Sequence, residues 1–429
     1  MIRLQESHLR ADFGAESGGI PSRSVAFLLD LGRALHRFGS PAHQLEDTLQ
    51  LAAQRLGIEA QFFYSPTAFL ATFGPPENQR TALVRFEPGS EVDLGKLQHL
   101  DELTQQVLAG ELSIAEARQT MADILSRPSR YPAWASWLCF GLISGAAARF
   151  FGGGPGEILV GACGGWLTGF LAQALGRFPG TGQVFELVSA FLAALLAGMA
   201  TFVLPIASFE ATVAALIILV PGFTLTVAMT EIATRHLVSG TTRLTSAAIV
   251  FLEIIFGVAL GQRLAGHFGA VSLERTAWPL PAWTEALAFL LTAGAFSVLF
   301  QVPLRKLPWV ILACALSFGG ARIGGAFLSP ETGVFLGAFL VGAGANAVAR
   351  WRNQPAALML VPGTLLLVPG SLGVRSLSMM LEKDPLSGVD SAFSMALLAI
   401  SIVAGLLVAN AVVAPRRRHS PVGTSGFLE

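Results

Sequence analysis

Hydrophobic residues are distributed unevenly along the chain. From about residue 134 they form long runs with short polar or glycine-rich breaks, whereas residues 22–126 alternate at helix and strand spacing. A bilayer core needs about 20 mostly apolar residues per helix. The second part therefore predicts ten transmembrane spans, an α-helical polytopic membrane fold, at 134–150, 157–175, 184–205, 211–232, 244–266, 284–303, 308–327, 331–349, 356–381 and 391–414.

The stretch LVPG occurs twice, at 219–222 and at 367–370, in the most apolar part of the chain. The copies are 148 residues apart, and Ser-Gly follows each at the same distance, at 239–240 and 387–388. Proline and glycine disfavour a helix interior, so each copy predicts a break in its span. The alternative is a kink that serves helix packing alone. Pro362-Gly363 adds a third such pair.

The same offset relates the two halves of the membrane part. It places the fourth span on the ninth, the fifth on the tenth, and Phe191-Leu192 on Phe339-Leu340. The longest break, 267–283, separates five spans from five. Because five is odd, the second copy would cross the membrane in the opposite direction. Such a 5+5 inverted repeat, with broken helices in corresponding positions, is typical of secondary transporters that bind substrate near the bilayer midplane.

Charge supports an orientation and a division into domains. Residues 1–130 hold 12 Lys/Arg and 16 Asp/Glu, and the remaining 299 residues only 16 and 12. With the N-terminus inside, 12 positive charges fall on the inner side and six elsewhere, which predicts cytoplasmic termini. The predicted domains are a flexible tail (1–21), a cytoplasmic α/β domain (22–130), two five-helix repeats (131–268 and 284–414), an extracytoplasmic connector (269–283) and a cytoplasmic tail (415–429).

The α/β domain is predicted from short periodic segments. A helix ends at Gly39, and Ser40-Pro41 is expected to start the next one as N-cap and first-turn proline. Three strands follow in "IEAQFFYSP", "AFLATFG" and "TALVRFEPG", and Ser113 with Glu116 predicts a capping box.

Several classes of site and partner are disfavoured. The start of the chain lacks the apolar core of a signal peptide, so we expect none. Three scattered cysteines provide neither metal spacing nor a disulfide framework, and a net charge of zero argues against nucleic acid. We expect no metal and no cofactor. The expected partners are a small-molecule substrate, protons and the lipid bilayer; a homo-oligomer stays open.

Charged residues within spans are the first functional candidates, because charge inside a bilayer is costly. Glu253 lies halfway along the fifth span, where burial would favour its protonated form and make it a candidate proton carrier. The alternative is a structural hydrogen bond to a neighbouring helix. Glu231, the second proton-coupling candidate, lies four residues before Arg235, the spacing of a pair on one helix face.

Candidate substrate-binding residues cluster near the breaks. A broken helix offers N–H donors and carbonyl acceptors that match the carboxylate and ammonium of an amino acid. Arg375 could bind a carboxylate, with snorkelling to the interface as the alternative. The full set of candidates is Pro221, Gly222, Thr224, Thr226, Asn346, Pro362, Gly363, Pro369, Gly370, Ser371, Arg375 and Asn410. Packing against backbone is the alternative for the two asparagines.

Several separate stretches resemble the threonine/serine exporter family. They are "LGRALHRFGSPAHQLEDTLQLAAQRLG", "PTAFLATF", "LVRFEPGSEVDLGKL" and "VLAGELSIAEA" in the N-terminal domain, the first LVPG span with "EIATRHLVSGTTRL", and "VPGTLLLVPGS". The resemblance covers about residues 22–414 and implies an inner-membrane exporter of threonine and serine, driven by the membrane potential or the proton gradient. Glu231 occupies the acidic position that the family tends to carry after the Pro-Gly motif.

Three other functions compete with amino-acid export. A two-protein version of the family is associated with dicarboxylate export, for which Arg375 alone is thin support. A channel would not need broken inverted repeats. An enzyme is disfavoured because no nucleophile–histidine arrangement, H-E-x-x-H or phosphate-loop motif is present.

Overall fold

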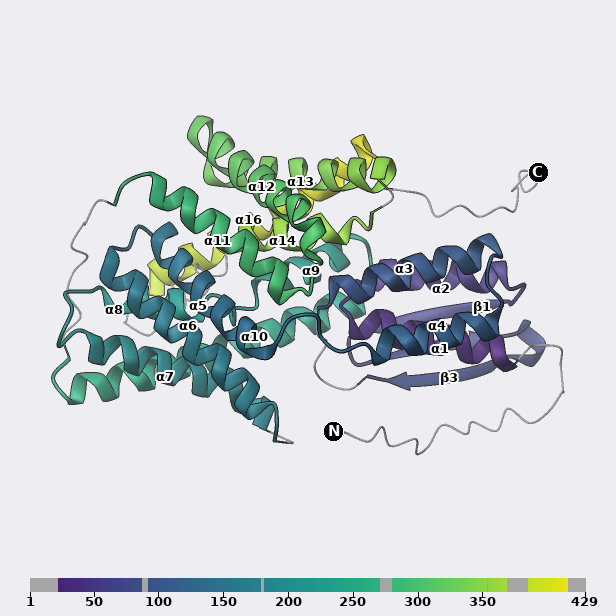
Figure 1. Ribbon diagram of the computed structural model, residues 1–429, viewed down its shortest axis with the longest axis horizontal. Helices are drawn as coiled ribbons and strands as arrows, with labels where there is room; N and C mark the ends of the chain where they lie inside the picture. The colour runs from purple at the N-terminus through teal and green to yellow at the C-terminus, as the bar shows by residue number, and fades with distance from the viewer. Residues whose placement is uncertain are drawn as a thin grey trace. The chain divides into compact units, whose positions relative to one another are not determined.

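The computed structural model describes residues 22–86, 92–178, 181–270, 280–352, 354–368 and 385–415 (Figure 1). They form two compact units, which are considered separately below. The N-terminal unit comprises residues 22–86 and 96–127, and the second unit comprises 92–95 and 128–415. The predicted tails at 1–21 and 416–429, most of the connector (271–279) and residues 369–384 lie outside the described residues.

The N-terminal unit packs four helices on one face of a three-stranded sheet. Its elements are α1 (Ser22–Arg37), α2 (Ala42–Arg55), β1 (Ala60–Ser65), β2 (Ala68–Phe73), the short η1 (Pro76–Asn78), β3 (Arg80–Arg85), α3 (Leu94–Ala109) and α4 (Ile114–Ser126). The strands are antiparallel in the order β1-β2-β3. Phe27, Leu31, Leu49 and Phe69 are buried in its core. The three strands thus fall where the alternating segments predict them.

The helix starts in this unit confirm one prediction and correct another. Ser113 and Glu116 form the predicted capping box at the start of α4. Hydrogen bonds from Ser113 hold the pKa of the Glu116 carboxyl below its usual value. At α2 the prediction was wrong: Pro41, and not Ser40, is the N-cap residue, and no side chain caps this helix. Proline lacks an N–H, so one unsatisfied donor is already absent there.

The second unit is entirely helical in its described residues. Its elements are α5 (Ala133–Phe150), α6 (Pro155–Leu175), η2 (Thr181–Val184), α7 (Phe185–Ala200), α8 (Ser208–Leu216), α9 (Gly222–Ala233), α10 (Leu237–His267), α11 (Trp283–Leu299), η3 (Leu304–Lys306), α12 (Leu307–Phe327), α13 (Pro330–Arg352), α14 (Ala357–Leu367) and α16 (Pro385–Val412). Within the described ranges, six helical segments are long and apolar enough to cross a membrane. The unit is therefore that of a multi-pass helical membrane protein.

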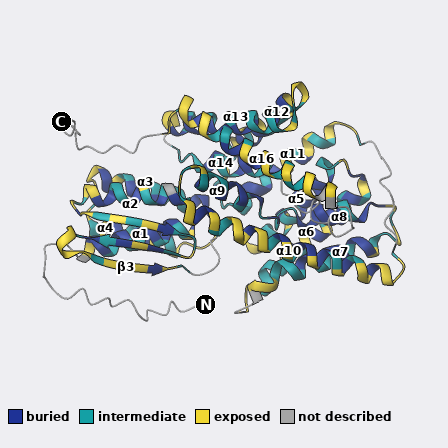
Figure 2. Ribbon diagram, turned by 180° about the vertical axis from the view of Figure 1, so that it is seen from behind, coloured by how far each residue is buried: buried dark blue, intermediate teal, exposed yellow. Residues whose placement is uncertain are grey.

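The outer surface of this unit carries large apolar side chains. Along α10, Leu252, Phe256 and Leu260 are exposed, while Ile254 and Val258 on the other side are buried (Figure 2). A helix that is apolar all round is either buried in a large protein or in contact with lipid. No element within the described ranges covers these outward side chains of α10, so lipid contact is the consistent explanation.

The same close helix contact occurs twice, 148 residues apart. On α10, a Cβ added to Gly257 would lie 2.5 Å from the carbonyl oxygen of Leu187 on α7. On α16, a Cβ added to Gly405 would lie 2.5 Å from the carbonyl oxygen of Phe335 on α13. Small residues permit this backbone approach in membrane helices. The α7–α10 and α13–α16 pairs thus share one packing geometry at equivalent positions.

Candidate functional site

The first LVPG stretch interrupts a span, as its residues predict. Helix α8 ends at Leu216 and α9 starts at Gly222, with Pro221 as the N-cap residue of α9. The amides of Leu219 and Val220 both donate to the carbonyl of Leu216, at 2.8 and 3.2 Å. The helical hydrogen-bond pattern therefore ends before the proline, which could not have continued it.

Serine side chains satisfy carbonyl groups beside the breaks. Ser144 on α5 donates to the carbonyl of Ala215 at 3.3 Å, and Ser317 on α12 donates to the carbonyl of Gly363 at 2.6 Å. Ala215 and Gly363 are again 148 residues apart. Both serines are fully buried. These two carbonyls are bonded within the protein, so they are poor candidates for substrate contacts.

The second half gives a different result at each of its two Pro-Gly pairs. Helix α14 ends at Leu367, and Val368 is extended (ψ 127) immediately before the second LVPG proline. The remaining candidates there, Pro369, Gly370, Ser371 and Arg375, lie outside the described residues.

The break predicted at Pro362-Gly363 was wrong, because α14 runs through this pair. Pro362 lies in the second turn of α14. Gly363 instead permits close packing: an added Cβ would lie 2.6 Å from Cγ2 of Val341 on α13. The pair serves helix packing, which was the alternative explanation for such residues.

Three of the remaining polar candidates, Thr226, Asn346 and Asn410, are hydrogen-bonded within the protein. Thr226 is buried and donates to the carbonyl of Gly222 at 3.1 Å, while Thr224 is half-buried on the same helix. Asn346 on α13 donates to Asn410 on α16 and to the carbonyl of Val413, both at 2.8 Å. The two asparagines thus join a pair of helices, as their structural alternative predicts.

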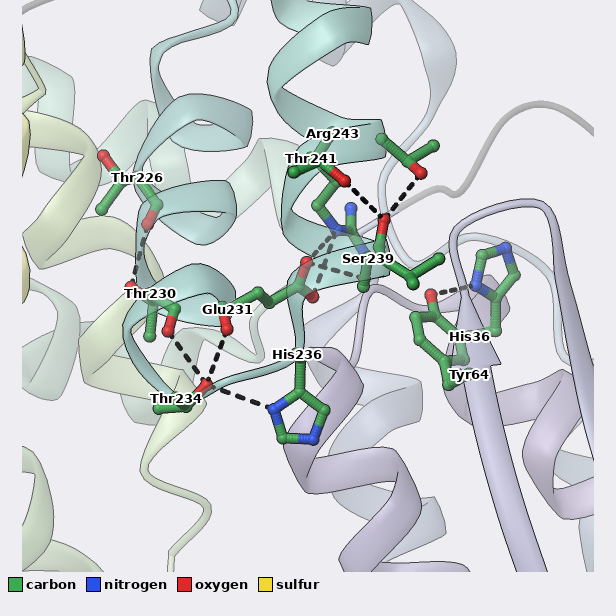
Figure 3. A network of polar contacts seen from close by, with 12 residues as sticks. His36, Tyr64, Thr226, Thr230, Glu231, Thr234, His236, Ser239, Thr241 and Arg243 are labelled. Atoms are coloured by element: carbon green, nitrogen blue, oxygen red, sulfur yellow. Dashed lines mark hydrogen bonds and ion pairs between the residues drawn. The ribbon is translucent and has the colours of Figure 1, made fainter.

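Glu231 is at the centre of a buried polar network near the end of α9 (Figure 3). Its side chain is fully buried and accepts a hydrogen bond from Ser239 at 2.7 Å. Arg243 of α10 donates from Nε to both carboxylate oxygens, at 3.1 and 3.2 Å. The carboxylate is therefore paired within the protein.

The predicted pairing of Glu231 with Arg235 on one helix face was wrong. Helix α9 ends at Ala233, and Arg235 lies in the following turn with a φ of 70°. The i,i+4 rule applies only while the helix continues. The turn reverses the chain, so that Arg243 from the next helix reaches Glu231.

The same geometry explains the Ser-Gly pair that follows the first LVPG. Ser239 supplies the hydroxyl that binds Glu231. Gly240 lets α10 approach α9 closely, since an added Cβ would lie 2.8 Å from the carbonyl oxygen of Ala228. Ser387 and Gly388, the second pair, lie at the start of α16 with side chains outside the described part.

A separate cavity lies between the start of α7 and the first half of α10. It is open to the surface of the unit, its volume is about 600 Å³, and Glu253 lies on its wall. Glu186 on α7 is a second carboxylate in the same lining. The complete lining is Gln183, Glu186, Thr241, Thr242, Thr245, Ser246, Ile249, Val250 and Glu253.

The polar lining of this cavity consists mainly of hydrogen-bond acceptors. The hydroxyls of Thr241, Thr242 and Thr245 donate to backbone carbonyls one turn earlier, at 2.7, 2.7 and 3.0 Å. Their oxygen lone pairs remain available as acceptors. Together with the carboxylates of Glu186 and Glu253 they form a surface that suits a proton or an ammonium group.

Sequence reasoning missed Glu186. It lies in the first turn of α7, where an acidic residue interacts favourably with the helix dipole. In the sequence it is therefore indistinguishable from an ordinary acidic residue at the start of a helix. A comparison of the two halves at the 148-residue offset could have found it. The residue equivalent to Glu186 is the apolar Val334, so the carboxylate is not part of the repeated pattern.

These features define a multi-pass helical membrane protein with a broken span and an acidic cavity. A family model described as a threonine/serine exporter matches residues 26–265, and a second, "Threonine/Serine exporter, ThrE", matches residues 285–412. The chain belongs to the threonine/serine exporter family.

Several curated relatives carry the name pheromone-regulated membrane protein 10. Pheromone-regulated membrane protein 10 of Candida albicans (strain WO-1) is 28% identical over 78% of this chain and 31% of its own length. The proteins of that name from Eremothecium gossypii and Saccharomyces cerevisiae (strain YJM789) are 28% and 26% identical, over 46% and 44% of their lengths. This chain thus spans less than half of these relatives. No solved structure matches it significantly.

Proposed function

We propose that this protein is a secondary exporter of small polar amino acids, threonine and serine, across the cell inner membrane, coupled to the proton gradient. The family and the acidic cavity between α7 and α10 support the proposal. The cavity is the single observation on which the substrate class rests, because it offers acceptors to a cationic group.

The cavity favours amino acids over dicarboxylates. A threonine or serine molecule carries an ammonium group, which two carboxylates and three hydroxyl oxygens can bind. A dicarboxylate would be repelled by Glu186 and Glu253, and none of the nine lining residues is basic. Arg375, outside the described residues, remains the candidate for the carboxylate of the substrate.

Glu253 is the proposed proton carrier. It faces the cavity from the middle of a 31-residue apolar helix, where a charge is costly. A second carboxylate, Glu186, lines the same cavity and adds to its negative charge. Binding of a substrate ammonium would compensate the negative charge and release the proton, which couples the two movements.

Alternating access is proposed to depend on ten spans in two inverted halves with cytoplasmic termini. The recurrence of the α7–α10 contact in α13–α16 supports a repeat of 148 residues. The interruption at 217–221 and the end of α14 at Leu367 support broken spans at equivalent places. Inverted repeats with discontinuous helices around a central site are the common design of secondary transporters.

Efflux from preloaded proteoliposomes tests the function. Labelled serine, threonine and succinate are compared with and without a pH gradient. We expect gradient-stimulated efflux of serine and threonine and little efflux of succinate. Equal rates for all three, independent of the gradient, would indicate a channel, and a preference for succinate would indicate a dicarboxylate exporter.

A further inference from the structure

Helix α9 is a short segment between two interruptions. It follows the break at 217–221, and the turn at 234–236, with Arg235 in the left-handed region, separates it from α10. Because α9 has 12 residues and no helix continues from either end, it can move as one rigid body about the break before it and the turn after it. Side-chain contacts therefore decide where α9 lies.

The contacts of α9 connect it to both halves of the membrane unit. It packs against α10, the helix that follows it, and against α14 and α16 from the second half. A movement of one half against the other must therefore either carry α9 along or change one of these contacts.

The strongest polar contact of α9 is the Glu231 network. Its fully buried carboxylate accepts from Ser239 at 2.7 Å and from Nε of Arg243 at 3.1 and 3.2 Å, and both partners are in the first two turns of α10 (Figure 3). Breaking a buried ion pair by removing one partner is strongly unfavourable, because a charge is left uncompensated. The pair therefore holds α9 to the start of α10 in this structure.

The first three turns of α10 also contribute to the wall of the cavity. Thr241, Thr242 and Thr245 line it, and Arg243 lies between them in sequence. A shift of α9 that pulls on Arg243 would therefore also move the acceptor groups of the cavity.

The geometry points to a latch. The Glu231–Arg243 pair holds α9 against the cavity-lining start of α10, and it opens when the two halves move during transport. This inference rests on the proposed transport function. Glu231 and Arg243 are then positioning residues, which control the rate of the conformational change and make no contact with the substrate.

Steady-state serine efflux from proteoliposomes tests the latch. We expect Glu231→Gln to lower Vmax by about fivefold or more while KM changes by less than about twofold. Arg243→Lys, which keeps the charge, should retain most of Vmax. A raised KM at unchanged Vmax would show that the pair binds substrate and would overturn the inference, as would wild-type values in Glu231→Gln.

Glu285→Gln is the matched control. Arg322 of α12 and Glu285 of α11 also form an ion pair between helices, at 2.6 Å, but Arg322 is 65% exposed. Breaking an exposed pair costs little. Kinetics close to wild type in this variant would show that losing an ion pair between helices does not by itself slow transport.

A labelling experiment separates the latch from the transport function. Thr245→Cys is introduced after Cys139, Cys163 and Cys314 are replaced, and its reaction with a water-soluble thiol reagent is timed. We expect Glu231→Gln to change the labelling rate by about threefold or more. If wild-type protein exports no amino acid but labelling still changes, the latch survives and the proposed function fails.

Ser239→Ala covers the case in which Glu231→Gln does not fold. It removes one hydrogen bond to the carboxylate and leaves the ion pair. We expect the same direction of change in labelling and in Vmax, at smaller size. Wild-type behaviour of Ser239→Ala in both measurements would contradict the latch.

Discussion

The α7–α10 pair and the α13–α16 pair are packed alike and differ in chemistry. Gly257 and Gly405 each face a carbonyl of the partner helix, at Leu187 and at Phe335, with the same predicted Cβ approach. Beside this shared contact, the first pair carries Glu186 and Glu253, and the equivalent residues of the second pair are Val334 and Ser401. The packing is thus duplicated, while the carboxylates of Glu186 and Glu253 occur only in the first copy.

This difference separates what supports the fold from what serves function. A residue that recurs 148 positions later is explained by the helix contact that both copies make. A carboxylate that occurs in one copy has no such explanation, and in a membrane helix it is costly. The comparison therefore identifies Glu186 and Glu253 as the residues to change first.

Glu253→Gln should have the largest effect. Glutamine keeps the size and polarity of the side chain but cannot release a proton, so we expect proton-coupled serine efflux to fall by about a hundredfold. The measurement is efflux from proteoliposomes with and without a pH gradient. Ser401→Ala at the equivalent position is the control, because Ser401 donates to its own helix at Leu397. Full coupling in Glu253→Gln would give Glu253 a structural role.

Glu186→Gln should have the second largest effect. If Glu186 binds the substrate ammonium together with Glu253, its loss should raise KM for serine by about tenfold, which corresponds to about 1.4 kcal/mol. An unchanged KM would show that Glu186 does not contact the substrate.

The sequence predicted those features that depend on backbone chemistry. The helical hydrogen bonds after α8 stop before Pro221, because proline has no N–H to donate. Strands β1 to β3 and the Ser113–Glu116 capping box likewise follow from local spacing. The apolar runs predicted membrane helices, of which six described segments are long enough to cross a bilayer.

The sequence could not predict which distant side chains meet. Arg243 replaces Arg235 as the partner of Glu231 because of a turn whose geometry no local rule fixed. Pro362 lies inside the continuous helix α14, although proline disfavours a helix interior. Glu186 joins Glu253 only through the packing of α7 on α10. All three results depend on tertiary packing, which local sequence rules do not describe.

Substitution of Gly257 or of Gly405 should lower the stability of the protein by equal amounts. These effects should be smaller than those of the two glutamate substitutions on transport. Gly257→Ala and Gly405→Ala each place a methyl group 2.5 Å from a backbone carbonyl oxygen. Such overpacking costs about 1–3 kcal/mol, so each variant should unfold a few degrees below wild type in detergent. A lower melting temperature in Gly257→Ala but not in Gly405→Ala would contradict the comparison. It would show that the second contact does not support the fold in the same way.

The smallest effect is expected for an exchange of small residues between the two pairs. The first pair has Ala194 opposite Gly261, and the second has Gly342 opposite Ala409, at equivalent positions. An added Cβ lies 2.8 Å from the Ala194 Cβ at Gly261 and 2.7 Å from the Ala409 Cβ at Gly342, so each contact holds one methyl group.

Gly261→Ala alone puts two methyl groups in that space and should destabilise the protein. Adding Ala194→Gly recreates the arrangement of the second pair, and the two opposite changes in helix propensity, each about 1 kcal/mol, offset one another. The double variant should therefore be more stable than Gly261→Ala alone. It should stay below wild type, because the added Cβ still lies 2.5 Å from the carbonyl oxygen of Phe191. If the double variant is less stable than Gly261→Ala, the two contacts are not interchangeable, and the duplicated packing would be a coincidence of small residues.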